Sequence, residues 1–151
     1  MASVEELKQR YVQLNSIDGI DEFVLQKIEG VLKVKKLPAE FRQISDFFSG
    51  GLLGGIDNFA FAYEGISPNI VEETLRLRAA IKLPTRFIVL AEPPESLIVM
   101  DTENTPSVIW CDATDAERIS TLDFVTEPQK WNTYLDFFNT MLDDEEDERI
   151  E

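Results

Sequence analysis

Few residues in this 151-residue sequence are suited to acid–base or nucleophilic chemistry, and most of those present are carboxylates. Histidine is absent, so the chain lacks the commonest general base, the usual triad member and the commonest metal ligand. The single cysteine, Cys111, follows the apolar run Val108, Ile109 and Trp110. Without histidine it cannot form a Cys–His nucleophile, and we expect a small buried hydrophobic residue.

The remaining candidates for catalysis are pairs of carboxylates, such as Asp101 with Glu103 or Asp112 with Asp115. Glycosidases use two acids at a suitable separation, which keeps a carboxylate enzyme open as an alternative. However, a chain with 29 acidic residues contains such pairs by chance. The glycines of residues 50–55 are not followed by the Gly-Lys-Ser/Thr of a phosphate loop, and no acidic segment has the spacing of a calcium loop. We therefore expect no enzyme, no catalytic residue, no metal and no cofactor.

The charge of the chain is its most distinctive property. Its 29 acidic and 14 basic residues give a formal net charge of -15. That magnitude lies well beyond the value of about 2 to 8 typical of a small domain. Such a field repels nucleic acid and anionic membranes, and it serves either solubility alone or attraction to a cationic protein. One cysteine, no basic N-terminal stretch before an apolar run, and no apolar segment of about 18 residues predict a cytoplasmic location.

Three helices are predicted in the N-terminal third. Ser3 with Glu6 forms a capping-box pattern before a helix over residues 4–14. Asp21 is a plausible cap for a second helix, with one apolar face made of Val24, Ile28, Val31 and Leu32. Pro38 is expected to open a third helix, whose apolar stripe is Phe41, Ile44 and Phe48 and whose end is the turn Ser49-Gly50-Gly51.

The middle of the chain is predicted to form an antiparallel sheet. A first strand is expected over residues 59–63, followed by a helix from Ser67-Pro68 to about residue 80 that lies over the sheet edge. That helix is expected to point Val71, Leu75 and Leu77 inward. Runs rich in β-forming residues over 86–91, 96–102 and 107–112 are joined by short turns, which implies antiparallel neighbours. A further short strand is expected over residues 121–125.

The C-terminal segment combines a strongly amphipathic helix with an acidic run. Thr126 and Gln129, with Pro128 between them, suggest a capped helix start. The apolar stripe of this helix is predicted to comprise Trp131, Tyr134, Leu135, Phe138, Met141 and Leu142. Residues 143–148 are all acidic and too polar to bury, so they predict a disordered tail. The expected organisation is one domain over residues 1–142 and an acidic tail over 143–151.

In its order of elements the sequence resembles the SUKH superfamily, over about residues 20–142. The residues that carry the resemblance are Glu29 to Leu32 leading into Leu37-Pro38, then Phe41, Phe47, Phe48 and Ser49-Gly50-Gly51, the strands Leu97 to Asp101 and Val108 to Asp112, and Trp131, Tyr134, Leu135 and Phe138. Two positions depart from the family pattern: Lys33 stands where glycine is usual, and Ser49 stands where asparagine is common.

The resemblance implies an α+β fold, with N-terminal helices and a C-terminal helix packed on a mostly antiparallel sheet of about four to six strands. For function it implies an immunity protein, or antitoxin, that binds and neutralises a cognate toxin, with a basic nuclease toxin as the expected partner. The alternative is a non-catalytic adaptor or regulatory binding protein. Neither nucleic acid nor membrane is an expected partner. The candidate toxin-interface residues lie in the loops and edges of the sheet: Glu92, Glu95, Asp101, Glu103, Asp112, Asp115 and Glu117.

Overall fold

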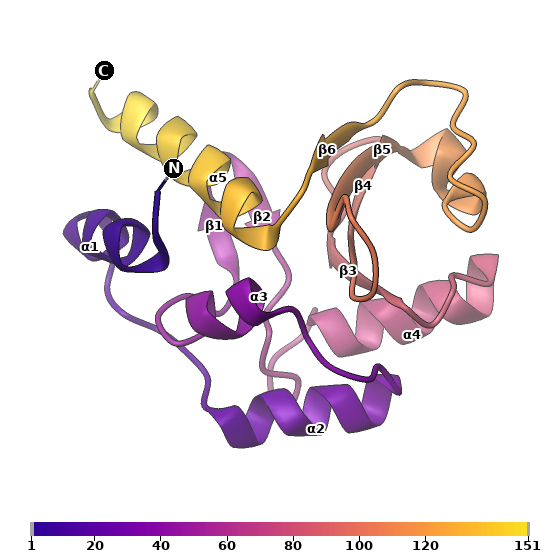
Figure 1. The fold of residues 1–151 in the computed structure, drawn as a ribbon, viewed down its shortest axis with the longest axis horizontal. Coiled ribbons are helices and arrows are strands. Elements are labelled where there is room, and N and C mark those ends of the chain that lie inside the picture. The colour runs from indigo at the N-terminus through magenta and orange to yellow at the C-terminus, as the bar shows by residue number, and fades with distance from the viewer. Residues whose placement is uncertain (1, 151) are drawn as a thin grey trace.

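The computed structural model describes residues 2–150 and has an α+β fold with two antiparallel sheets (Figure 1). The elements, in chain order, are α1 Val4–Leu14, α2 Glu22–Leu32, α3 Ala39–Ile44, β1 Gly51–Leu53, β2 Ile56–Asn58, α4 Ile70–Ile81, β3 Phe87–Ala91, β4 Ser96–Asp101, β5 Val108–Asp112, the 3-10 helix η1 Ala113–Arg118, β6 Gln129–Trp131 and α5 Tyr134–Ile150. The predicted fold class is confirmed. Met1 and Glu151, the outermost residues of the predicted domain and tail, lie outside the described residues.

The first two helices begin where the capping patterns place them. The Ser3 hydroxyl accepts a hydrogen bond from the Glu6 amide at 3.2 Å, and the Asp21 carboxylate accepts one from the Val24 amide at 3.0 Å. Each cap satisfies an amide that the first helical turn leaves without a partner. The buried face of α2 differs from the prediction, because it consists of Leu25, Ile28 and Leu32, whereas Val31 is exposed.

The main sheet has the strand order β3-β4-β5-β6, and every neighbouring pair is antiparallel. Its residues alternate between two apolar clusters because successive side chains point to opposite faces. Ile88, Ile98 and Val108 pack into the larger cluster with the aromatic residues of α3 and α5. Phe87, Val99, Ile109 and their neighbours pack into a smaller cluster with Leu77, Leu83 and Ile119. Burial of both faces explains why these strands read as continuous apolar runs.

Helix α4 lies along the edge strand β3, in agreement with the prediction (Figure 1). The Thr74 hydroxyl accepts a hydrogen bond from the Val89 amide at 2.9 Å, so the helix satisfies a donor that an edge strand leaves open. Val71 and Leu77 are buried as expected, but Leu75 is exposed.

The prediction of a strand over residues 59–63 is wrong. The Phe59 amide donates to the Leu90 carbonyl at 2.9 Å, while the Phe61 amide donates to the Ser49 carbonyl at 3.0 Å. This extended segment therefore divides its hydrogen bonds among different partners and forms no ladder. The hairpin of β1 and β2 precedes it instead, because Gly54 and Gly55 both have positive φ and make the two-residue turn that pairs the flanking residues.

The predictions for residues 121–131 are also wrong. The segment predicted as a strand over 121–125 is a turn and loop, and residues 129–131 form β6 rather than the first turn of the last helix. Pairing of β6 with the open edge of β5 outweighs the local capping pattern, since each ladder bond satisfies a backbone group. Helix α5 starts after Thr133, whose hydroxyl accepts a hydrogen bond from the Asp136 amide at 3.1 Å.

The acidic run is helical in the structure and not a disordered tail. Helix α5 continues without a break from its apolar part through residues 143–150 (Figure 1). Its first turns carry Tyr134, Phe137, Phe138, Met141 and Leu142 into the core, where the Phe138 ring contacts the rings of Tyr11, Phe47 and Phe48. Helix propagation from this anchored segment, together with contacts to α1 described below, extends the helix into the acidic run.

Candidate protein-binding surface

The seven predicted interface carboxylates lie at two opposite ends of the main sheet. Glu92 and Glu95 are in the β3–β4 turn, and Asp112 pairs with Ser96 at the same end. Asp115 and Glu117 follow in η1. Asp101 and Glu103 are at the other end, where β4 leads into the turn before β5. The seven carboxylates therefore do not form a single contact surface.

Two of the seven are buried and hold backbone in place. Asp101 is 3% exposed and accepts hydrogen bonds from the amides of Glu103 and Asn104 at 2.9 and 3.1 Å. Its other oxygen accepts from Arg86 Nε at 3.1 Å. Asp115 is 1% exposed and accepts from the amides of Val125 and Thr126 at 3.2 and 3.0 Å. Both carboxylates hold loop backbone in place, and their oxygens are already engaged in hydrogen bonds.

Two further members are exposed but already engaged. The Asp112 carboxylate accepts hydrogen bonds from the amide and hydroxyl of Thr114, and these bonds lower the pKa of Asp112. Glu92 forms an ion pair with Arg76 of α4. Glu95, Glu103 and Glu117 are exposed and have no ion pair within residues 2–150. These three are the predicted residues best placed to meet a cationic partner.

Glu103 and Asp101 also line a cavity of about 440 Å³ at their end of the sheet. Glu40 of α3 and the apolar Pro38 line the same cavity. Its other lining residues have polar side chains: Thr102, Asn104, Thr105, Ser107, Asn132 and Thr133. Glu40 is not among the predicted residues, because no local pattern shows that α3 and the β4–β5 turn meet. This open, polar hollow with two exposed or half-exposed carboxylates is suited to a cationic side chain.

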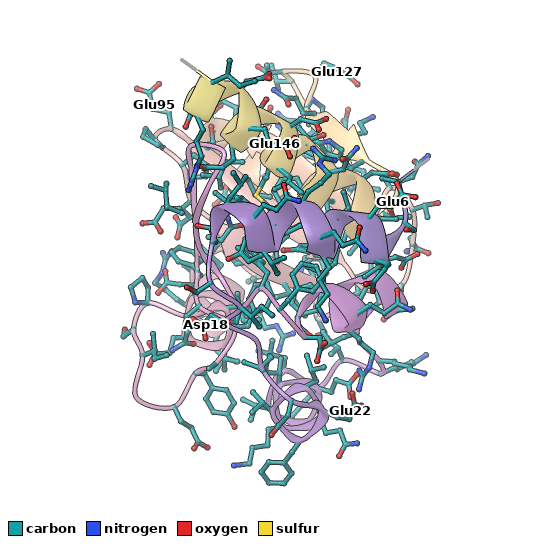
Figure 2. The ribbon with its side chains drawn as sticks, turned by 90° about the vertical axis from the view of Figure 1, so that its left-hand side faces the viewer. Glu6, Asp18, Glu22, Glu95, Glu127 and Glu146 are labelled. Carbon is teal, nitrogen blue, oxygen red and sulfur yellow. The ribbon has the colours of Figure 1, made fainter. Side chains whose placement is uncertain are left out.

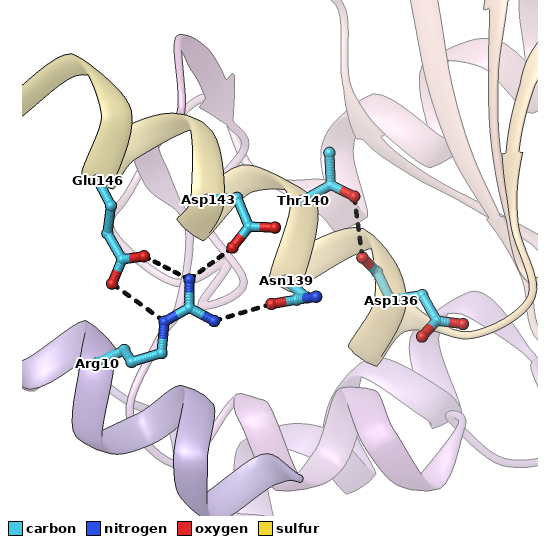
Figure 3. Close-up of polar contacts among 6 residues, drawn as sticks. All are labelled: Arg10, Asp136, Asn139, Thr140, Asp143 and Glu146. Atoms are coloured by element: carbon cyan, nitrogen blue, oxygen red, sulfur yellow. Dashed lines mark hydrogen bonds and ion pairs between the residues drawn. The ribbon is translucent and has the colours of Figure 1, made fainter. Parts of the chain in front are cut away.

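The second concentration of carboxylates is the acidic end of α5, residues 143–148, which α1 anchors through Arg10 (Figure 3). The Arg10 guanidinium donates to Glu146 at 2.5 and 3.0 Å and to Asp143 at 2.6 Å. It also donates to Asn139 at 2.9 Å. Hydrogen bonds to Arg10 lower the pKa of Glu146, and those from Arg149 and the Gly54 amide lower the pKa of Glu145. Figure 2 shows Glu146 above α1 on the same side of the molecule as Glu6.

The acidic end of α5 was missed as a structured surface because a run of like charges ordinarily indicates disorder. The spacing of Glu145 and Arg149 was the available signal, since residues four apart face each other only on a helix. Asp144, Asp147 and Glu148 are exposed, and none has an ion pair in the part of the chain that the structure describes.

The single cysteine lies inside the fold. Cys111 is 1% exposed, and burial raises the pKa of its thiol to about 11, so the thiolate is scarce near neutral pH. The prediction that it is a buried hydrophobic residue is confirmed. Among residues 2–150 no cluster of three or more Cys, Asp or Glu side chains has the arrangement of a metal site. Over the same residues, no helix is both long and apolar enough to cross a bilayer.

Comparison with known protein families identifies the family of this chain. The SUKH_5 family model, described as SMI1-KNR4 cell-wall, matches residues 1–127. The chain belongs to the SUKH superfamily. The match includes α1 and the sheet as far as β5 and η1, and it ends before β6 and α5. Both the acidic end of α5 and the closing-helix residues that contributed to the resemblance therefore lie outside the matched segment. A search of the curated proteins finds no significant match.

Membership of the SUKH superfamily is consistent with an immunity-type protein that acts by binding. Negative groups are exposed at three places: Glu95 and Glu117 near one end of the main sheet, Glu103 beside the cavity at the other end, and the acidic end of α5. These carboxylates can accept charge-assisted hydrogen bonds from arginine and lysine side chains.

Proposed function

We propose that this protein is an immunity protein that binds and neutralises a cognate toxin, and that the toxin is a nuclease with a basic substrate-binding surface. Membership of the SUKH superfamily, together with a net charge of -15, carries the proposal. A nuclease must present positive groups to hold phosphates, so an acidic protein can cover the surface that binds its substrate. Opposite charges also accelerate association, to about 10⁸–10⁹ M⁻¹s⁻¹ at low salt.

A second function is an adaptor that holds a regulatory partner. The description of the matching family, SMI1-KNR4 cell-wall, favours it, because that description refers to the cell wall and not to a toxin. The same acidic surfaces would then recruit a basic protein without neutralising an enzyme. The two functions differ in one measurable consequence, which is whether the partner is harmful when expressed alone.

The test begins with the full chain as bait and continues with the captured protein expressed in cells. Under the proposed function, the partner alone arrests growth and degrades nucleic acid, and co-expression of this chain restores growth. With purified components, nuclease activity should fall to zero at one equivalent of the chain. A specific partner that is harmless when expressed alone and acts in the cell wall or in signalling would replace the immunity function by the adaptor function.

A further inference from the structure

Two adjacent hollows of about 270 and 290 Å³, which share Ala62, lie between residues 18–27 and residues 60–66, apart from the acidic surfaces described above. Only the first of them is lined by α2, and the turn of residues 49–51 also lines the second. Phe23, Lys27 and Tyr63 line the first hollow, and Asp18 and Ile66 line the second. We call this feature the α2 groove.

The α2 groove exposes large apolar side chains that the core does not use. The side of α2 that faces the core is formed by Leu25, Ile28 and Leu32, which leaves Phe23 on the outer side with 62% of its surface exposed. Ile66, which lines the second hollow, is 50% exposed. Exposed apolar groups gathered in a hollow are typical of a protein-interaction site, and aromatic residues are enriched among those that dominate binding energy.

One side of the second hollow, residues 18–20, is held by backbone hydrogen bonds. The Asp18 amide donates to the Phe47 carbonyl at 3.2 Å, and the Ile20 amide donates to the Ser45 carbonyl at 2.8 Å. Between them, a Cβ atom on Gly19 would lie 2.1 Å from the Asp46 carbonyl oxygen, so only glycine permits this approach. A segment held in this way needs little ordering when a partner binds.

The lining of the α2 groove contains one more carboxylate than it has cations, and its single cation, Lys27, lies 4.7 Å from the centre of the Phe23 ring. The two carboxylates are Asp18 and Glu64, and Lys27 pairs with Glu64 at 3.2 Å. Asp18 has no ion pair within residues 2–150. Figure 2 shows Asp18 and Glu22 at the lower part of the same side of the molecule, below α1. The complementary ligand is therefore an apolar side chain flanked by positive residues.

We propose that the α2 groove docks an apolar side chain, flanked by arginine or lysine, from the basic protein partner. This inference rests on the proposed function, because it takes the partner to be a basic protein. Phe23 and Ile66 would contact the apolar side chain, while Asp18 would pair with a flanking cation. The groove thereby adds an apolar anchor to an interface whose other contacts are electrostatic, and such anchors contribute most of the affinity in many complexes.

The first experiment requires no toxin, so its failure is distinguishable from failure of the proposed function. The isotope-labelled full chain is titrated by NMR with the peptide Arg-Arg-Trp-Arg-Arg, and Arg-Arg-Gly-Arg-Arg serves as the apolar control. We expect saturable shifts at the amides of Phe23, Ala62 and Ile66 with the tryptophan peptide only. Phe23→Ala should abolish them, whereas Leu75→Ala, which removes an exposed apolar side chain from α4, should not. Shifts confined to the acidic end of α5, or equal shifts with both peptides, would overturn the proposal.

The second experiment uses the neutralisation assay. Phe23→Ala should weaken binding of the identified toxin at least about tenfold and reduce protection, whereas Leu75→Ala should protect like the wild type. Equal protection by Phe23→Ala and the wild type would remove the groove from the interface and leave the proposed function intact. Sedimentation of the chain alone tests whether a second copy of the chain occupies the groove. A dimer that dissociates in the Phe23→Ala variant would show that it does and would overturn the proposal.

Discussion

At the scale of single residues, carboxylates of similar sequence context have different roles in this protein. Asp115 is 1% exposed and accepts two backbone hydrogen bonds from the loop that leads to β6. Glu117, two positions later, is exposed. Burial decides the difference, because a buried carboxylate must be satisfied by hydrogen bonds, whereas an exposed one is satisfied by water. Only exposed carboxylates remain available to a partner.

The substitution Asp115→Asn tests this structural role. We expect it to lower the free energy of unfolding by about 1–3 kcal/mol, since an amide replaces one of the two acceptor oxygens with a donor facing a backbone amide. Glu117→Gln is the matched control and should leave stability unchanged within about 0.5 kcal/mol. Denaturant unfolding measures both values. Unchanged stability of Asp115→Asn combined with weaker partner binding would return Asp115 to the interface.

At the scale of elements, the acidic end of α5 opposes its own helix dipole. The C-terminal end of a helix carries partial negative charge, so Asp147 and Glu148, in the last turn of α5, are placed where carboxylates are unfavourable, and residues 143–146 add mutual repulsion. Arg10 of α1 binds Asp143 and Glu146, while Glu145 accepts from Arg149 and from the Gly54 amide (Figure 3). These contacts offset the repulsion and fix α5 against α1 and the β1–β2 turn.

Replacing Arg10 measures how much this contact stabilises the fold. Arg10→Gln should destabilise the protein by about 1 kcal/mol near neutral pH, which lowers Tm by about 2–4 °C. Arg76→Gln, which removes a more exposed arginine that also pairs with two glutamates, should have a smaller effect. Thermal unfolding of the three proteins measures the difference.

The effect of Arg10→Gln should depend on pH. The pKa of Glu146 is lower in the folded protein than its ordinary value, so folding favours the ionised form. The stabilisation by the Arg10–Glu146 contact is therefore complete above the pKa of Glu146 in the unfolded chain, about 4.3. It is lost as pH falls through the lower pKa of Glu146 in the folded protein. The Tm difference between wild type and Arg10→Gln should shrink below about pH 4. A difference that stays constant between pH 7 and pH 3 would show that Arg10 acts by packing and not by charge.

At the scale of the whole molecule, the net charge of -15 influences any encounter with a partner. The field of so many like charges steers a basic protein toward the surface before specific contacts form. Direct contacts of exposed carboxylates and steering by the overall field have different consequences for substitutions. Only the effect on direct contacts depends on which carboxylate is replaced. The three exposed candidates Glu95, Glu103 and Glu117 belong to the turns of the main sheet and to η1, whereas the acidic run belongs to α5. In Figure 1 the main sheet and the C-terminal end of α5 lie on opposite sides of the view.

A pair of charge reversals separates the two effects. Glu95→Lys with Glu117→Lys changes the net charge by the same amount as Asp144→Lys with Asp147→Lys on α5. If the sheet loops contact the toxin, the first pair should slow association more and flatten its salt dependence more than the second. Association rates at low and moderate salt provide the measurement. Equal slowing by both pairs would assign the effect to overall charge, and unchanged rates in both would exclude electrostatic steering.

What the sequence by itself determined was the set of features that depend on neighbouring residues. The caps at Ser3 and Asp21, the three apolar strands β3, β4 and β5, and the burial of Cys111 follow from short-range hydrogen bonding and side-chain alternation. The superfamily was also recognisable, because it rests on the order of these local elements.

Only the tertiary structure decided features that depend on distant partners. Residues 129–131 form a strand because the edge of β5 offers them a ladder, and the acidic run stays helical where Arg10, more than 130 residues earlier in the chain, binds it. Asp101 and Asp115 are buried because loops close over them, which no local pattern reveals. The α2 groove likewise exists only where residues 18–27 meet residues 60–66. Long-range hydrogen bonds and burial outweigh local propensity whenever they satisfy groups that the local structure leaves unpaired.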